Sequence, residues 1–401
     1  MNIVAISWKN LKLKPLNTAL NILLVAFGTG ILVLLLLASS QIGEKMEHNS
    51  KDIDLVVGAK GSPLQLVLSS IYYIDFPTGN ILLKDAQRVM RDPAVKKAVP
   101  LALGDNYNGI RIVGTDSNFI DLYDLKLQSG RFWHSDFEAT IGAAVALDQN
   151  LKIGDNFFGA HGLTGSADVH KSHAYKVTGI LEAQGSVADD LILTSVRSVW
   201  KMHDHVGHDH DHHDHEQTDN GEKELTSLLI RYRSPLSAAL FPRMINETTN
   251  MQAASPAQES TRLFSLIGIG IDTLQWFALM IMVIAGISVF VSLYNALKER
   301  AYDLAIMRSI GASRPVIFAI VISEGLAMTF IGSVLGIFLA HLSLQLISCY
   351  QEGSQTRFNG LIFINSELLV LAAGLLTGMV SSVIPALRAY QADISRILAG
   401  K

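Results

Sequence analysis

Four long apolar runs divide the chain into membrane-type and polar stretches. They cover residues 16–37, 273–297, 315–348 and 368–387, and only the third contains ionisable side chains, Glu324 and His341. A helix rises about 1.5 Å per residue, so about 20 apolar residues cross a hydrocarbon core roughly 30 Å thick. The pattern therefore predicts four transmembrane helices.

The stretch between the first two runs, residues 39–265, has no apolar run long enough to span. It contains strand-like alternation at 54–57, 109–114 and 175–181, and helix-like periodicity at 84–91 and 196–203. Turn signals lie at 77–80 and 104–106. We therefore expect an α-helical membrane domain of four transmembrane helices plus a large α+β extracytoplasmic domain inserted between the first and second helices.

Shorter segments flank these parts. Residues 1–15 carry Trp8 and three lysines among apolar positions, a pattern typical of an interfacial amphipathic helix. A cleaved signal peptide is the rival interpretation, but the apolar run that follows is longer than the about 7–15 residues of such peptides. Residues 39–50 and 256–271 are expected as stalk helices. The complete expected order is 1–15 interfacial helix, 16–38 first span, 39–265 periplasmic α+β domain with stalk helices, 266–297 second span, 298–314 cytoplasmic coupling segment, 315–348 third span, 349–367 short periplasmic loop, 368–388 fourth span and 389–401 cytoplasmic tail.

Composition and charge agree with a protein that is part membrane and part soluble. Hydrophobic residues make up 49% of the 401 positions. Residues 39–265 hold 21 Lys and Arg against 29 Asp and Glu, whereas the rest holds 11 against 7. An acidic outer domain argues against a nucleic-acid partner. The single cysteine, Cys349, excludes an intrachain disulfide.

The basic residues also predict the orientation. Residues 298–314 carry four Lys and Arg, and three more follow the fourth span, whereas the loop 349–367 has only Arg357. Because cytoplasmic loops are enriched in Lys and Arg, both termini and residues 298–314 should face the cytoplasm. The segment 298–314 is itself expected to form a short amphipathic helix that ends at Gly311, or else an ordinary loop between spans.

Several sequence motifs, taken in order, resemble the FtsX-like permease family of ABC transporters, whose relatives include MacB-type exporters and lipoprotein-releasing permeases. ERAYDLAIMRSIGASRPVIFAIVISEGLAM (299–328) resembles the family's stretch between its second and third spans. IRIVGTDSNFIDLYDLKLQSGRFW (110–133), GAAVALDQNLKIGDNFFG (142–159) and YKVTGIL (175–181) resemble its outer-domain signatures, and PALRAYQADISRIL (385–398) its carboxyl end.

The resemblance implies a permease subunit in the bacterial inner membrane, paired as a homodimer with a cytoplasmic ATPase dimer that binds ATP. It implies that the ATPase contacts the segment 298–314, with candidates Glu299, Arg300, Asp303, Arg308, Gly311 and Ala312. This sequence has no G-x-x-x-x-G-K-[ST] motif, so we expect no enzyme activity and no nucleotide site on the chain itself. The one cofactor that the sequence suggests for this chain is Zn²⁺, at a histidine-rich tract.

A histidine-rich tract is the chain's clearest departure from the family. It comprises His203, His205, His208, His210, His212, His213 and His215, interleaved with aspartates. Imidazole-rich tracts bind zinc and similar ions, so the tract is either a weak zinc site or a solvated loop. A sparser set, His161, His170 and His173, lies near Asp168 and is either a second metal site or plain surface.

Two features inside the spans are candidates for helix packing or function. Glu324 is an intramembrane acid, which is costly unless it faces protein or water, so it is a structural partner or a functional group. Gly332-x-x-x-Gly336 and Gly374-x-x-x-Gly378 permit close helix contact, either within a subunit or across a dimer.

The preferred function is a permease that couples ATP hydrolysis to work on the outer side, for export, lipoprotein or lipid handling, or activation of a periplasmic partner. Two alternatives stay open. One is a metal or metallophore exporter. The other is a non-transporting regulator, whose outer domain senses metal or recruits a hydrolase.

Overall fold

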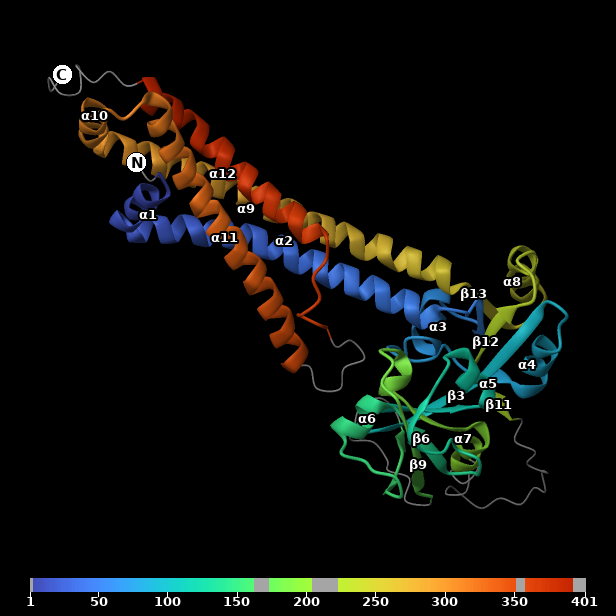
Figure 1. Cartoon of the computed structure of the whole chain (residues 1–401). Helices are drawn as coiled ribbons and strands as arrows, with labels where there is room; N and C mark the ends of the chain where they lie inside the picture. The colour runs from blue at the N-terminus through green and yellow to red at the C-terminus, as the bar shows by residue number, and fades with distance from the viewer. Residues whose placement is uncertain (1–2, 162–172, 204–222, 351–357, 392–401) are drawn as a thin grey trace, which may run out of the picture. The chain divides into compact units, whose positions relative to one another are not determined.

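The computed structural model describes residues 3–161, 173–203, 223–350 and 358–391 (Figure 1). The chain divides into two compact units, each treated by itself below. The helical unit holds the described residues up to Ile42 and from Ile267 onward, and the sheet unit those from Gly43 to Leu266. The divisions fall inside helices α2 and α9, which are each continuous across them.

Long helices make up the helical unit. Four are long and apolar enough to cross a membrane, namely α2 (Pro15–Ser50), α9 (Pro256–Glu299), α11 (Arg314–Tyr350) and α12 (Ser366–Gln391). The two shorter helices of the described part are α1 (Ile3–Leu13) and α10 (Ala301–Ser309). The expected four-span pattern is confirmed, and both stalk segments are helical extensions of the spans they adjoin.

Glycines let the spans approach closely. A Cβ added to Gly336 of α11 would lie 2.5 Å from the carbonyl oxygen of Ala26 and 2.9 Å from the amide nitrogen of Gly30, both on α2. A Cβ on Gly378 of α12 would collide with the side chain of Thr329 on α11. Of the two alternatives, contact within a subunit or across a dimer, the small-residue motifs therefore serve contacts within one chain.

The sheet unit is built on a mixed sheet. The strands of this unit are β1 (Leu55–Ala59), β2 (Ile81–Leu82), β3 (Val95–Tyr107), β4 (Ile110–Thr115), β5 (Leu127–Gly130), β6 (Glu138–Ile141), β7 (Asn156–Phe157), β8 (Ala160–His161), β9 (Tyr175–Leu181), β10 (Ile192–Ser195), β11 (Glu224–Leu225), β12 (Ser227–Tyr232) and β13 (Met251–Ala254). Strands β2 and β11 pair with each other and the rest form the mixed sheet. Its own helices are α3 (Pro63–Ser70), α4 (Leu83–Met90), α5 (Ser117–Leu122), α6 (Ala143–Asp148), α7 (Val196–His203), α8 (Ser237–Thr248) and the 3₁₀ turn Val187–Asp190.

The main sheet runs in the order β13-β1-β12-β3-β4-β10-β6-β9-β5, with β7 beside β9 and β8 beside β3. Pairs β4–β10 and β6–β9 are parallel and the other pairs antiparallel. Buried aliphatic side chains cover the sheet in separate clusters, one of them around Leu101, Val113 and Leu193. Together with the four spans, this confirms the expected fold class.

One local prediction was wrong. The turn expected at residues 104–106 is part of β3, which continues to Tyr107. Its pairing with β4 shifts register between Leu103 and Asn106, and β8 pairs with Asp105 and Asn106. The Gly-Asp-Asn signal therefore marks an irregularity inside a strand, and a second partner strand supplies the hydrogen bonds that a turn would have left to water.

Both stalk ends are fastened to the sheet unit. The Tyr72 hydroxyl donates to the carbonyl of Met46 at 3.2 Å and lies 3.1 Å from the Ser260 hydroxyl, so one side chain joins the end of α2 to the start of α9. Asn49 of α2 accepts a hydrogen bond from the amide of Val187 at 3.0 Å. These ends of α2 and α9 therefore belong to the sheet unit.

Candidate functional site

Helix α10 lies between the second and third spans, where the sequence predicted it. Helix α9 ends at Glu299, α10 covers Ala301–Ser309, and α11 begins at Arg314. Gly311 has φ of +111°, a left-handed conformation that glycine adopts without strain, and it follows the last helical residues. The short helix closed by Gly311 is thus confirmed.

The two faces of α10 differ sharply. Ala305 is buried, and Leu304 packs on the cluster formed by Ile317 and Ala389 at the ends of α11 and α12. The outward face instead exposes Tyr302, Ile306 and Ile310, with exposed fractions of 58%, 36% and 82%. These three side chains recur every four residues and form one row, which we call the outer row. An exposed apolar row on a packed helix is typical of a protein contact.

A buried polar network ties the start of α10 to α1 and α11. Arg300 donates to the backbone carbonyl of Asn10 at 2.8 Å and lies 3.6 Å from a carboxylate oxygen of Glu324. The Asn10 amide donates to the same carboxylate at 2.5 Å. The side chains of Arg300 and Glu324 are only 18% and 8% exposed. The intramembrane acid Glu324 therefore has two partners inside the chain, Arg300 and Asn10 of α1.

The six residues expected to contact an ATPase lie in and beside α10 but differ in orientation. Glu299 forms an ion pair with Lys14, which lies between α1 and α2, and Arg300 points inward. Asp303 and Gly311 are exposed, whereas Arg308 and Ala312 are half-buried. Sequence reasoning did not single out the outer row, although its four-residue spacing was the available signal.

A second buried polar pair fastens the loop before α12. His341 of α11 lies 2.7 Å from the carbonyl oxygen of Gly360 through Nδ1 and 3.1 Å from Glu367 through Nε2. Glu367 also accepts the amide of Ile364 at 2.9 Å. The sequence reasoning named His341 as an interruption of a span but missed its partner Glu367, which lies 26 positions away.

The expected metal sites fall largely beyond the described residues. His205, His208, His210, His212, His213, His215 and His170 lie outside that part, as do the side chains of His161 and His203. His173 stacks on Phe137 with ring centroids 4.6 Å apart. Across the described residues, no group of three or more His, Cys, Asp and Glu side chains could hold a metal ion.

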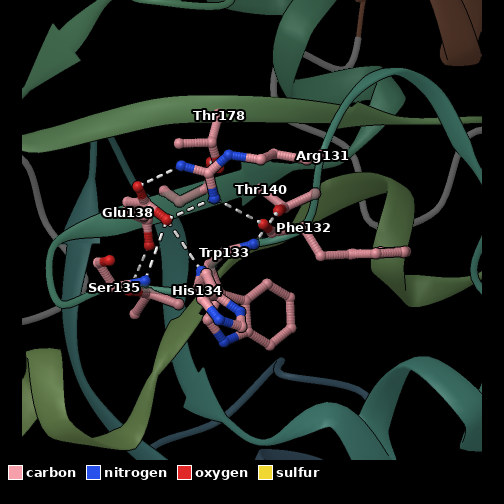
Figure 2. Close-up of polar contacts among 10 residues, drawn as sticks. Arg131, Phe132, Trp133, His134, Ser135, Glu138, Thr140 and Thr178 are labelled. Carbon is pink, nitrogen blue, oxygen red and sulfur yellow. Dashed lines mark hydrogen bonds and ion pairs between the residues drawn. The ribbon is translucent and has the colours of Figure 1, made fainter.

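In the sheet unit, the Gly-Arg motif forms a carboxylate clamp (Figure 2). Gly130 has φ of +80°, which places Arg131 beside Glu138. Arg131 donates through two nitrogens, at 2.7 and 2.5 Å, and the amides of His134 and Ser135 donate to the same carboxylate at 2.9 and 3.0 Å. The hydrogen bonds from Arg131, followed by those from the two amides, hold the pKa of Glu138 at about 2.

The variant Glu138→Gln is expected to lower the free energy of unfolding of the sheet unit by about 2 kcal/mol at neutral pH, because charge-assisted hydrogen bonds are lost. Since folding depresses this pKa from 4.5 to about 2, the native clamp contributes fully above pH 4.5 and its contribution is lost as pH falls toward 2. The Glu138→Gln variant should not show this decrease in stability between pH 4.5 and 2. The measurement is urea unfolding of the full chain, followed by tryptophan fluorescence. The substitutions Trp8→Phe and Trp276→Phe leave only Trp133 and Trp200, both in the sheet unit, as reporters.

The matched control is Glu247→Gln, which removes an exposed carboxylate paired with Arg243 within one helix turn. Its expected effect stays within about 0.5 kcal/mol and leaves the acid sensitivity unchanged. Equal acid sensitivity in Glu138→Gln and the unmodified protein would show that the clamp does not govern acid stability.

Comparison with known proteins assigns the chain. Residues 18–247 match the MacB-like periplasmic core domain, and residues 276–394 match the FtsX-like permease C-terminal domain. The pyoverdine export ATP-binding/permease protein PvdT of Pseudomonas putida is 21% identical over 356 residues, which cover 83% of this chain. The chain spans about half (50%) of that relative's length.

Solved structures of outer domains also match, at low similarity. The periplasmic region of MacB from Actinobacillus actinomycetemcomitans covers 55% of this chain and 97% of its own, with a TM-score of 0.35 and 12% identity. The extracellular domain of the noncanonic ABC-type transporter YknZ from Gram-positive bacteria covers 51% and 99%, with a TM-score of 0.30 and 14% identity. On the two domain matches, which together cover most of its length, the chain belongs to the MacB- and FtsX-like permease family of ABC transporters.

Proposed function

We propose that this chain is a permease subunit whose ATPase is a separate cytoplasmic protein that docks on α10. The observation that carries the proposal is the outer row, Tyr302, Ile306 and Ile310, exposed on a helix whose other face is packed against the spans. A few well-packed side chains, tyrosine prominent among them, supply most of the energy in protein contacts when their surroundings exclude water. The neighbouring charges of Asp303 and Arg314 would form the polar rim of the contact.

The packing of α10 supports a role in passing force into the membrane. Arg300 and Glu324 link the start of α10 to α1 and α11, and Leu304 links its middle to the ends of α11 and α12. A load on the outer row would therefore reach several helices at once. Helix α9 is continuous from Glu299 to Pro256, and Ser260 near its far end contacts Tyr72. A helix of this length is the means by which movement would reach the outer domain.

The proposed setting is the bacterial inner membrane, with both termini and α10 cytoplasmic and the sheet unit periplasmic. The excess of Lys and Arg in residues 298–314 and after the fourth span supports this orientation. Two copies of the chain would serve an ATPase dimer, one α10 for each ATPase subunit. A periplasmic or lipoprotein partner would then receive the movement of the sheet unit.

Two uses of such a device are distinguishable. In export or lipid handling, ATP hydrolysis moves a solute, a lipoprotein or a lipid. The Pseudomonas relative, for example, is named as an exporter of pyoverdine. In the regulatory use, the outer domain activates a periplasmic partner without movement of cargo. Vesicles that contain the permease and its ATPase separate the two, because only the first use gives flux that depends on ATP.

Docking is tested with Ile306→Asp and Ile310→Asp, each co-expressed with a cytoplasmic ABC ATPase from the same organism. Each variant places a charge in the proposed apolar contact, so co-purification of the ATPase should fall about tenfold or more. The control is Leu361→Asp, which replaces an apolar side chain outside α10 that is 78% exposed, close to the 82% of Ile310. It should leave co-purification unchanged. Retention of the ATPase by both α10 variants would refute docking on the outer row.

A further inference from the structure

An apolar groove runs between α9 and α12 in the helical unit. Its cavity measures about 480 Å³ and is lined by residues that include Met282, Val283, Phe290, Thr377, Val380 and Ile384. At its floor the two helices come close, because a Cβ on Gly286 would lie 2.8 Å from a methyl carbon of Thr377. None of the lining residues is charged. The groove lies within the apolar runs of both helices, at a depth where lipid chains surround a membrane protein.

Cations gather at one end of this groove. A cavity of about 220 Å³ there is lined by Tyr294, Lys298 and Arg388, with Arg308 contributed by α10. Arg388 donates to the Tyr294 hydroxyl at 2.6 Å, and the Lys298 ammonium lies 4.8 Å from the Tyr294 ring centroid. Within the described parts of the chain, no carboxylate lies in ion-pair range of Lys298 or Arg388. Among the described residues, the charges of Lys298 and Arg388 therefore have no carboxylate counter-ion.

The two cavities follow each other along the same pair of helices. Phe290 lines the first and Tyr294 the second, one turn apart on α9, and their rings stack with centroids 6.1 Å apart. Ile384 and Arg388 have the same relation on α12. The surface thus presents an apolar groove that ends at Tyr294 and the two cations Lys298 and Arg388.

We propose that this surface binds one anionic phospholipid. Its phosphate would lie at Lys298 and Arg388, and an acyl chain would lie along the groove between α9 and α12. Basic pockets between transmembrane helices recognise anionic head groups by charge, and the groove supplies the apolar half of the site. A zwitterionic lipid fits less well, because its own ammonium group meets two cations.

The charges also argue against a second copy of the chain as the occupant. A two-fold symmetric contact through this groove brings the same patch from both subunits together. Lys298 and Arg388 would then face cations of the other copy, and none of the residues that line either cavity is acidic. A lipid phosphate reduces the net positive charge at this end of the groove, whereas a second copy doubles it.

The site would also connect lipid to α10. Leu304 and Arg308 of α10 line the cationic cavity on the side opposite the outer row. A phosphate at Lys298 therefore lies against the helix that we propose as the ATPase contact. The binding site itself rests only on the groove and its charges and does not depend on that proposed function.

The test uses the full chain in nanodiscs that contain either phosphatidylglycerol or phosphatidylcholine with a photoactivatable acyl chain. Cross-linked peptides from α9 and α12 are quantified by mass spectrometry. Phosphatidylglycerol should label the groove about tenfold more strongly than phosphatidylcholine. Lys298→Gln with Arg388→Gln should abolish that preference, whereas Lys9→Gln with Lys12→Gln, the same charge change on exposed positions of α1, should preserve it.

A second pair of variants tests the apolar half. Val283→Trp places an indole at the groove and should reduce its labelling about tenfold, whereas Val334→Trp, on an exposed position of α11 outside the groove, should not. Equal labelling by both lipids, or an unchanged preference in the Lys298 and Arg388 variant, overturns the proposal. Protein–protein cross-links between two copies at Val283, with no lipid label there, would show that a second copy occupies the groove.

Discussion

Gly336→Leu is expected to destabilise the helical unit by about 3 kcal/mol, at the upper end of overpacking costs in protein interiors. The added side chain begins with a Cβ that would lie 2.5 Å from the Ala26 carbonyl oxygen and 2.9 Å from the Gly30 amide nitrogen. Both obstacles are backbone atoms of α2, so no change of rotamer relieves the clash. The two helices must separate, and the contacts that neighbouring side chains make between them are lost.

Thermal unfolding of the purified protein in detergent measures this effect, with Gly336→Ala as a graded variant. Because the Cβ alone already clashes, the alanine variant should show a large part of the loss. Gly268→Leu is the matched control, since a Cβ on Gly268 meets nothing within 4 Å. That substitution should be neutral or slightly stabilising, because leucine favours helix more than glycine does. If both leucine variants unfolded at one temperature, close packing at Gly336 would not be a source of stability.

Arg300→Ala should cost the helical unit about 3 kcal/mol, the lower end of the range for breaking a buried ion pair. The substitution leaves the Glu324 carboxylate, 8% exposed, with the Asn10 amide as its remaining described hydrogen-bond partner. It also removes the hydrogen bond that Arg300 donates to the Asn10 carbonyl. The penalty comes mainly from the uncompensated charge, so it should shrink when that charge is also removed.

The double variant Arg300→Met with Glu324→Leu tests this cause, since replacing both partners by apolar groups restores much of the loss at buried pairs. Unfolding temperatures of Arg300→Met, Glu324→Leu and the double variant give the coupling between the two residues. Arg314→Ala is the control, because Arg314 is exposed and its described contact is with the Tyr390 ring. A double variant less stable than Arg300→Ala would mean that the pair contributes more than the relief of a buried charge.

The sequence alone predicted the elements whose pattern is local. Strand β9 covers residues 175–181 and helix α7 residues 196–203, as the periodicity indicated. The four spans and α10 also followed from apolar length and from Gly311. These predictions succeed because the direction in which side chains point repeats every 2 residues in a strand and every 3.6 in a helix. The alternation of apolar and polar residues over a short segment therefore indicates the type of element.

Only the tertiary structure decided the contacts between distant positions. The residues that surround Glu324 include Asn10, which lies 314 positions away, and no local pattern pairs them. The same holds for the strand at residues 104–106, where pairing with β8 outweighs a turn signal. It holds also for the outer row, because the side of α10 that remains exposed depends on where Ile317 and Ala389 pack. Hydrophobic periodicity fixes which side chains share a face, whereas packing between elements fixes what each face meets.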